Sequence, residues 1–194
     1  DDFRAYKVAI ATEAIDKYDL DGLDWDFCRF PRFFREGRAR QNAELITEML
    51  RKLRAKLDEK GEASAFEGDV TSSADCRRMV EAAIDRYGRL DVLVNNVGIV
   101  VKGNVVTVDE EDWQRVIDVN LKSMVLTSKH AVPRMVEGGG GSIINMSSFL
   151  GLRSGSVFES VPYSVSKGGI LSLTTTMAVE HGRDNVRVNA VVPG

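Results

Sequence analysis

The sequence predicts an α/β fold: a Rossmann-like, doubly wound parallel sheet that is incomplete and is preceded by an atypical helix–strand–helix segment. Two observations carry this prediction. Short segments that are almost wholly apolar alternate with longer segments whose apolar residues recur at helical spacing. Polar or glycine-containing motifs directly follow the apolar segments, and ligands of such sheets bind beyond the carboxyl ends of the strands.

The first expected elements are a strand, a helix and a second strand. Residues 63–67 predict a short strand that ends at Gly68-Asp69-Val70, and Thr71 or Ser72 would cap a helix that runs to about Tyr87. Residues 90–94 are nearly all apolar, which is typical of a parallel strand covered on both faces.

The remaining elements continue this alternation. A helix is expected from about residue 109 to residue 137, interrupted near Asn120. Glycines at positions 138–141 then predict a turn. A strand, a helix and a last strand follow, at residues 142–146, 163–181 and 186–191.

Composition and charge exclude several classes of protein. The chain of 194 residues is 43% hydrophobic, as expected for a globular domain of ordinary size. Its net charge of −3, with basic and acidic residues intermixed, predicts no nucleic-acid partner. No apolar run approaches the ~20 residues of a membrane helix, and the first residues do not form a signal peptide. Cys28 and Cys76 form no metal motif and suggest no disulfide, so we expect no metal site and a cytoplasmic, reducing location.

Tyr163 and Lys167 are the most informative pair in the chain. They stand four residues apart in Val161-Pro-Tyr-Ser-Val-Ser-Lys167, and on a helix this spacing places a phenol beside an ammonium group. A nearby positive charge favours the phenolate form, which a general acid and base at an alcohol or a carbonyl needs. Such a pair, taken alone, is more often part of a solvated helix face.

The pair belongs to a set of motifs that follow each other in a fixed order. They are Leu90-Asp-Val-Leu-Val-Asn-Asn-Val-Gly98, Asp118-Val-Asn120, Gly141-Ser-Ile-Ile-Asn-Met-Ser-Ser148, the Tyr163 motif and Val186-Arg-Val-Asn-Ala-Val-Val-Pro-Gly194. In this order and spacing the chain resembles the short-chain dehydrogenase/reductase family over about residues 60–194. The resemblance implies reversible interconversion of a small-molecule alcohol and a carbonyl, with NAD or NADP as cofactor.

The resemblance implies catalytic roles for four residues. Ser148 would hydrogen-bond the substrate oxygen, and Tyr163 would transfer the proton. Lys167 would favour the phenolate and contact the nicotinamide ribose, while Asn120 would hold a water that relays protons to the lysine. From the residues alone, Ser148 could instead be a helix cap or a loop hydroxyl, and Asn120 could mark a helix bend.

The resemblance also implies cofactor-binding residues. They are Asp69, Val70, Asn95, Asn96, Val97, Gly98, Tyr163, Lys167, Pro193 and Gly194. Asp69 would reach the adenine ring, and Asn95 and Gly98 would line the cofactor. From the residues alone, Asp69 could be a turn residue, Asn95 could bridge backbone groups between strands, and Gly98 could only permit an unusual backbone angle.

Residues 1–59 do not fit this resemblance and form a separate expected segment, ahead of the domain at 60–194. Glu13 stands where the family has the first glycine of its Thr-Gly-x-x-x-Gly-x-Gly turn, and a carboxylate there would repel the pyrophosphate. Residues 3–18 are expected to form a helix, and residues 22–27 a strand.

This front segment resembles part of a glycoside-hydrolase-like TIM barrel, on the residues Asp21-Gly-Leu-Asp-Trp-Asp-Phe-Cys28. Chitinase-like barrels have their general-acid glutamate where this chain has Cys28. Asp24 and Asp26 fall on one strand face. As a catalytic pair they would make the chain a carbohydrate-active protein; solvated carboxylates are the alternative.

We therefore expect an NAD(P)-dependent oxidoreductase, with a Rossmann-like remnant that binds no cofactor as the alternative. With Glu13 in the phosphate turn, and with the chain ending before the family's substrate loop, weak or no activity is expected. A homodimer or homotetramer is expected through the helices at 119–137 and 163–181. Apolar and small residues of these helices include Leu126, Ala131, Leu171, Leu173 and Ala178.

Overall fold

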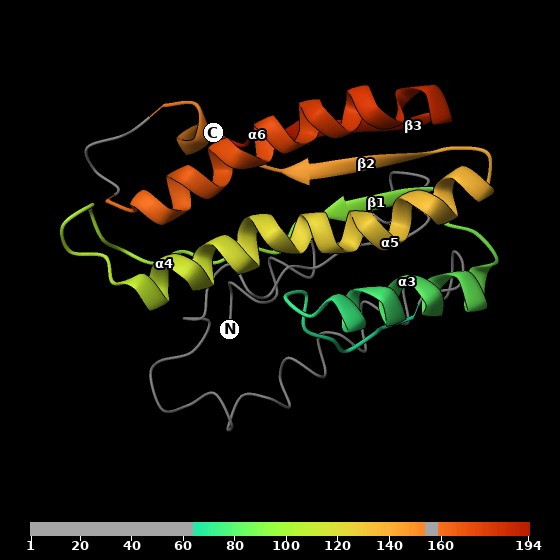
Figure 1. Cartoon of the computed structure of the whole chain (residues 1–194), viewed down its shortest axis with the longest axis horizontal. Coiled ribbons are helices and arrows are strands. Elements are labelled where there is room, and N and C mark those ends of the chain that lie inside the picture. The colour runs from blue at the N-terminus through green and yellow to red at the C-terminus, as the bar shows by residue number, and fades with distance from the viewer. Residues whose placement is uncertain (1–63, 154–158) are drawn as a thin grey trace, which may run out of the picture. The chain divides into compact units, whose positions relative to one another are not determined.

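The computed structural model describes residues 64–153 and 159–194 (Figure 1). The elements expected at residues 1–59, including the strand that carries Asp24 and Asp26, lie outside the described residues. Residues Phe66–Gly194 form one compact unit, and all the strands of the described sheet belong to it.

The described elements alternate between helix and strand. In chain order they are α3 (Ser73–Tyr87), β1 (Val92–Asn95), α4 (Glu110–Ile117), the π-helical turn η2 (Asp118–Lys122), α5 (Ser123–Glu137), β2 (Gly141–Met146), the 3₁₀ turn η3 (Phe149–Gly151), α6 (Val161–His181), the 3₁₀ turn η4 (Gly182–Asp184) and β3 (Val186–Val191). The strands form a parallel sheet in the order β1-β2-β3. The predicted α/β architecture, an incomplete Rossmann-like sheet, is therefore confirmed.

The prediction of a strand at residues 63–67 is wrong for residues 64–67, the part that the structure describes. Residues 64–67 are exposed and belong to no strand. An extended segment becomes a strand only when its N–H and C=O groups pair with a neighbour. In the described sheet β1 pairs with β2 alone, and residues 64–67 do not pair with its free side.

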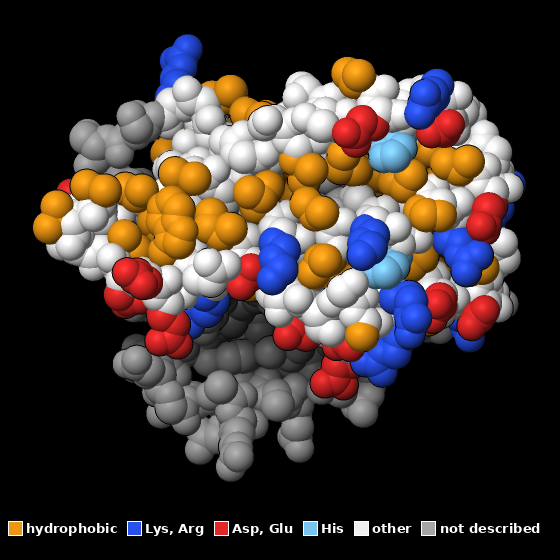
Figure 2. All heavy atoms as spheres, viewed as in Figure 1, with side chains coloured by type: hydrophobic (Ala, Val, Ile, Leu, Met, Phe, Trp, Pro, Cys, Tyr) orange, Lys and Arg blue, Asp and Glu red, His pale blue; other side chains and the backbone are white. Residues whose placement is uncertain are grey.

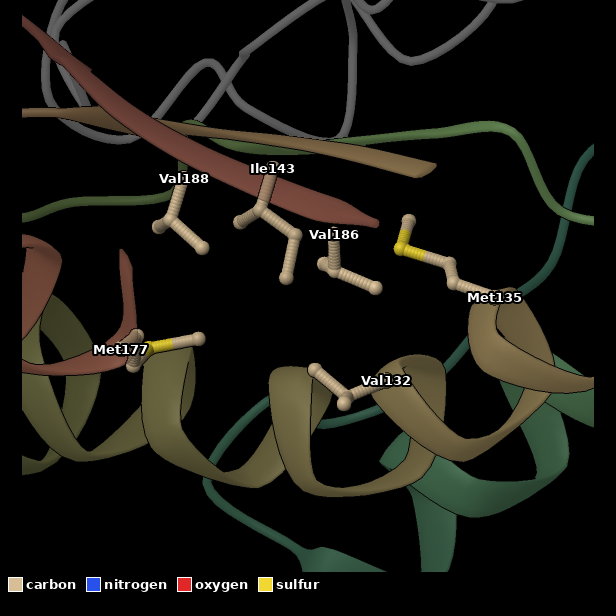
Figure 3. Close-up of a cluster of buried hydrophobic side chains, with 6 residues drawn as sticks. All are labelled: Val132, Met135, Ile143, Met177, Val186 and Val188. Carbon is tan, nitrogen blue, oxygen red and sulfur yellow. The ribbon is translucent and has the colours of Figure 1, made fainter. Parts of the chain in front are cut away.

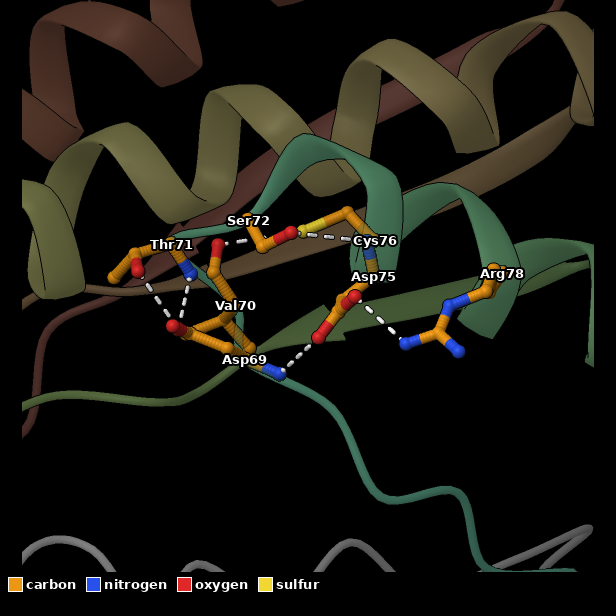
Figure 4. Close-up of polar contacts among 7 residues, drawn as sticks. All are labelled: Asp69, Val70, Thr71, Ser72, Asp75, Cys76 and Arg78. Atoms are coloured by element: carbon orange, nitrogen blue, oxygen red, sulfur yellow. Dashed lines mark hydrogen bonds and ion pairs between the residues drawn. The ribbon is translucent and has the colours of Figure 1, made fainter.

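Helix α3 begins where the sequence places a cap. Ser72 Oγ accepts a hydrogen bond from the Asp75 amide at 3.3 Å, which satisfies one of the free N–H groups of the first turn (Figure 4). Asp75 accepts the Asp69 amide at 2.9 Å and the Arg78 guanidinium at 2.7 Å. These bonds, the first above all, hold the pKa of the Asp75 carboxyl below its usual value. Gly88 ends the helix in the left-handed conformation, at φ 80°.

The long helix expected at residues 109–137 is confirmed, together with its interruption. Asp109 caps it, since its Oδ1 accepts the Asp112 amide at 2.8 Å. The π-helical turn η2 then separates α4 from α5 and contains Asn120. Turns of this kind inside α-helices are frequent at functional sites.

Helices α5 and α6 pack against one face of the sheet (Figure 1). Their side chains meet those of the strands in a buried cluster (Figure 3). It consists of Val132, Met135, Ile143, Met177, Val186 and Val188. Fully burying a side chain of this size stabilises the fold by about 1.5–3 kcal/mol. None of the helices in residues 64–153 and 159–194 is long and apolar enough to cross a membrane.

Among the described residues, nothing covers the other face of the sheet at β1. Val92 and Val94 are 53% and 40% exposed, whereas Asn95 is buried. The expectation that this strand is covered on both faces is therefore wrong for the described residues. Apolar residues at successive positions place a side chain on each face, but they do not determine which face carries a helix.

Candidate active site

Tyr163 and Lys167 lie in the first two turns of α6, which begins at Val161 with Pro162 in its first turn. The Lys167 Nζ lies 5.5 Å from the centre of the Tyr163 ring, so the two groups do share one helix face. Only 6% of Tyr163 and 4% of Lys167 is exposed. A solvated helix face is therefore the wrong interpretation of this pair.

Two consecutive residues at the end of β2 hold Lys167. Its Nζ donates a hydrogen bond to the Met146 carbonyl at 2.6 Å, and the Ser147 hydroxyl donates to the Lys167 carbonyl at 2.7 Å. The first bond gives the buried ammonium group the partner that it needs, because burying an unpaired charge is strongly unfavourable. The second bond holds the backbone of Lys167. The sequence analysis missed this role of Ser147, and the only signal for it was the neighbouring Ser148.

Ser148 lies just beyond the carboxyl end of β2. Its Oγ accepts the Leu150 amide at 3.3 Å and so caps η3, which is the structural role that the sequence left open for it. A hydroxyl that accepts one bond still has its proton to donate. The Phe149 amide donates to the Pro193 carbonyl at 3.0 Å, which brings the end of β3 to the same edge of the sheet.

The turn η3 passes very close to the backbone of α6 at Lys167. A Cβ atom on Gly151 would lie 2.6 Å from the Lys167 carbonyl carbon and 2.7 Å from its oxygen. Side chains do not come so close to backbone atoms, so this contact requires glycine. A Cβ on Gly168 would likewise lie only 3.3 Å from the Gly151 carbonyl oxygen. The two glycines thus let the segment that follows Ser148 reach the helix of Tyr163 and Lys167.

Asn120 joins η2 to two other segments. Its Oδ1 accepts the Ile99 amide at 2.7 Å, and its Nδ2 donates to the Ile99 carbonyl at 2.9 Å and to Ser166 Oγ at 3.0 Å. Gly98 lies beside it, where a Cβ would be 3.5 Å from Asn120 Oδ1 and 3.6 Å from Lys167 Nζ. Gly98 does not have a positive φ, so the alternative of an unusual backbone angle is wrong.

Asn95 is buried at the end of β1 and faces Asn145, its register partner on β2. Its Nδ2 donates to Asn145 Oδ1 at 2.9 Å, and its Oδ1 accepts the Thr127 hydroxyl at 2.6 Å. Asn145 donates in turn to Thr174 Oγ1 at 3.0 Å. This network links α5 to α6 through side chains, so Asn95 does not bridge backbone groups of the strands as one alternative had it.

Asp69 has the turn role that the sequence left open. It is exposed, and its Oδ1 accepts the Thr71 hydroxyl at 2.7 Å and the Thr71 amide at 2.8 Å. These two bonds, the hydroxyl first, hold the pKa of the Asp69 carboxyl below its usual value. The Val70 carbonyl accepts the Cys76 thiol at 3.3 Å (Figure 4). Contact of this turn with an adenine ring stays a prediction.

The sequence matches the short chain dehydrogenase family over residues 33–194, which includes part of the front segment. It is 40% identical to an uncharacterized oxidoreductase of Thermotoga maritima over 159 residues, or 82% of this chain and 58% of the relative. It is 36% identical to the meso-2,3-butanediol dehydrogenase of Serratia marcescens over 162 residues, or 84% and 63%. The chain thus spans less than two thirds of the length of either relative.

The structure is similar to a solved short-chain type dehydrogenase/reductase of Mycobacterium marinum. The TM-score is 0.72 and the sequence identity is 32%, and the match covers 76% of this chain and 59% of that one. This likeness shows that the chain shares the fold of that protein.

Proposed function

Because the chain belongs to the short-chain dehydrogenase family, we propose that it acts as an NAD(P)-dependent oxidoreductase that interconverts an alcohol and a carbonyl. The observation that carries this proposal is the buried contact between Tyr163 and Lys167, held against the carboxyl end of β2. Ser148 follows that same strand, and Asn120 holds the segment after β1.

The proposed chemistry at this site is proton transfer. The Tyr163 hydroxyl gives its proton to the substrate oxygen during carbonyl reduction and takes it back during alcohol oxidation. Ser148 donates a hydrogen bond to the same oxygen, and Lys167 places a positive charge beside the Tyr163 ring. A bound nicotinamide cofactor would supply or accept the hydride.

The residues present fit a nicotinamide dinucleotide at this edge of the sheet. At position 98 even a Cβ atom would touch Asn120 and Lys167, so glycine keeps a side chain away from these two groups. Asn96 and Val97, which connect Asn95 to Gly98, are half-buried. Both Nδ2 protons of Asn120 are used in the bonds described above, so the expected relay water would bind another of its atoms.

We propose a small-molecule substrate and leave its identity open. A homodimer or homotetramer stays a prediction, with one correction: Ala131 is fully buried within the chain and cannot form an interface. Apolar side chains that are exposed on these helices include Val125, Val165 and Val179, and Figure 2 shows hydrophobic side chains spread over the face of the molecule formed by α4, α5 and α6.

The comparisons favour neither alternative function. A carbohydrate-active protein would depend on Asp24 and Asp26, which lie outside the described residues. A remnant that binds no cofactor differs from the proposed enzyme in a measurable way, which is its affinity for NADH and NADPH. The cytoplasmic location likewise stays a prediction.

A fluorescence titration with NADH and NADPH tests the proposed function. We expect weak binding by the chain as given and stronger binding by a repaired chain, which carries a Thr-Gly-x-x-x-Gly-x-Gly turn at residues 12–19 and a relative's C-terminal segment. Two charge-assisted hydrogen bonds at about 1.5–3 kcal/mol each correspond to roughly a hundredfold or more in affinity.

Two variants of the repaired chain localise the binding. Gly98→Leu is expected to weaken it, because the leucine would fill the space beside Lys167. Gly182→Leu is the matched control, since a Cβ at Gly182 meets no atom within 4 Å. If the repaired chain binds neither nucleotide, the proposal fails.

A further inference from the structure

We propose that Ser160 is a positioning residue: its hydroxyl fastens the start of α6 to the segment that follows β1 and thereby sets the placement of the Tyr163 phenol. The functional meaning of this placement rests on the proposed function, in which Tyr163 transfers the proton. The fastening itself is a property of the fold, and it can be measured without any enzyme activity.

Ser160 lies at a junction between two segments far apart in the sequence. Its Oγ donates a hydrogen bond to the Val101 carbonyl. On either side of it, the Gly103 amide donates to the Glu159 carbonyl and the Val161 amide donates to the Gly103 carbonyl, each at 3.0 Å. The backbones of Gly103 and Ser160 thus form an isolated parallel bridge. Only 3% of Ser160 is exposed, so water does not readily replace these bonds.

Ser160 does not form the cap hydrogen bond that a serine at the start of a helix usually forms. It is the N-cap residue of α6, where a serine hydroxyl normally accepts a hydrogen bond from an amide of the first turn. The Ser160 side chain makes no such cap bond and donates to Val101 instead. A residue that breaks a local rule in this way commonly serves the site rather than the element.

Loss of the Ser160 hydrogen bond is expected to change the position of Tyr163 more than that of Lys167. Tyr163 lies in the first turn of α6, three residues after Ser160, where a helix without its cap frays most readily. Lys167 lies one turn further on and is held independently by Met146 and Ser147. Loss of the Ser160 bond should therefore displace the phenol while the lysine stays in place.

The segment after β1 is held at two points, by Asn120 as well as by Ser160. Asn120 binds the amide and the carbonyl of Ile99, and Ser160 binds the carbonyl of Val101. The segment next to Gly98 is thereby fixed at one end to η2 and at the other to α6. Through Ser160, the position of the phenol is tied to the strand end where the cofactor is proposed to bind.

The test is an NMR experiment on the chain as it exists, with ¹³C-labelled tyrosine. The sequence has four tyrosines, and Tyr163→Phe identifies the Tyr163 ring signal. Ser160→Ala is expected to shift or broaden that signal while the Tyr87 signal stays unchanged. Amide hydrogen exchange at Gly103 and Val161 should become faster in the same variant.

Three further variants make the result decisive. Ser160→Thr keeps the hydroxyl donor and should retain the Tyr163 signal, and Ser160→Cys, a near-isosteric weak donor, replaces Ser160→Ala if that variant does not fold. Ser172→Ala, on an exposed part of α6, is the matched control and should change neither signal.

An unchanged Tyr163 signal in Ser160→Ala or Ser160→Cys would overturn the proposal, as would an equal change in Tyr87 and Tyr163. Absence of NAD(P)H binding and turnover in the repaired chain would instead count against the proposed function and would leave this structural result intact.

Discussion

Replacing Tyr163 by phenylalanine in the repaired chain is expected to lower the rate of carbonyl reduction by about 10²–10⁴-fold, the usual contribution of a positioned general acid. The substitution removes only the hydroxyl. The ring, which is buried and lies beside Lys167 Nζ, keeps its packing, so the fold and the cofactor affinity should change little. The measurement is the initial rate of NADH or NADPH oxidation with a carbonyl substrate.

Tyr87→Phe provides the matched control for this prediction. Tyr87 is the last residue of α3 and is 40% exposed, and the same atom is removed there. Its rate should equal that of the unsubstituted protein. If Tyr163→Phe were equally active, the proton would have to come from another group, and the proposed role of Tyr163 would be wrong.

Replacing Asn145 by leucine is expected to cause a large loss of stability. Asn145 is fully buried, and its removal leaves Asn95 and Thr174 each without one hydrogen-bond partner. Since an unsatisfied buried polar group costs about 1–3 kcal/mol, the two together should lower the free energy of unfolding by roughly 2–6 kcal/mol. That is a large part of the about 5–15 kcal/mol that stabilises an ordinary domain.

Urea denaturation measures this loss, as a lower midpoint at an unchanged slope. Asn189→Leu is the control, because Asn189 lies on the neighbouring strand β3 and is exposed on the opposite face. Its unfolding free energy should stay within about 0.5 kcal/mol of the unsubstituted value. Equal stability of the two variants would show that an apolar side chain replaces the polar network without cost.

Most of the described elements could be predicted from the sequence because their signals are local. The sequence predicts a cap at Thr71 or Ser72 and a helix that starts near residue 109, and the structure places the caps at Ser72 and Asp109. The strand at residues 63–67 could not be judged in this way. Whether an apolar segment becomes a strand depends on a neighbouring strand, and that is a tertiary property.

The site was predictable only in part, for the same reason. The spacing of Tyr163 and Lys167 places them on one helix face whatever surrounds the helix. The pairing of Asn95 with Asn145 depends on the register between two strands, and the requirement for Gly151 depends on how closely η3 crosses α6. The signal that remained unused was asparagine at position 145, between the apolar residues Ile144 and Met146.

Transfer of an isotope label tests the central claim most directly. The repaired chain is supplied with reduced nicotinamide cofactor that carries deuterium at its hydride position, together with a panel of small ketones and aldehydes. Mass spectrometry then measures deuterium in the product alcohols. We predict label on the carbinol carbon for the intact site and little or none in the same time with Tyr163→Phe. Absence of labelled alcohol across the panel, from a repaired chain that binds the cofactor, would contradict the assignment of these residues to an oxidoreductase site.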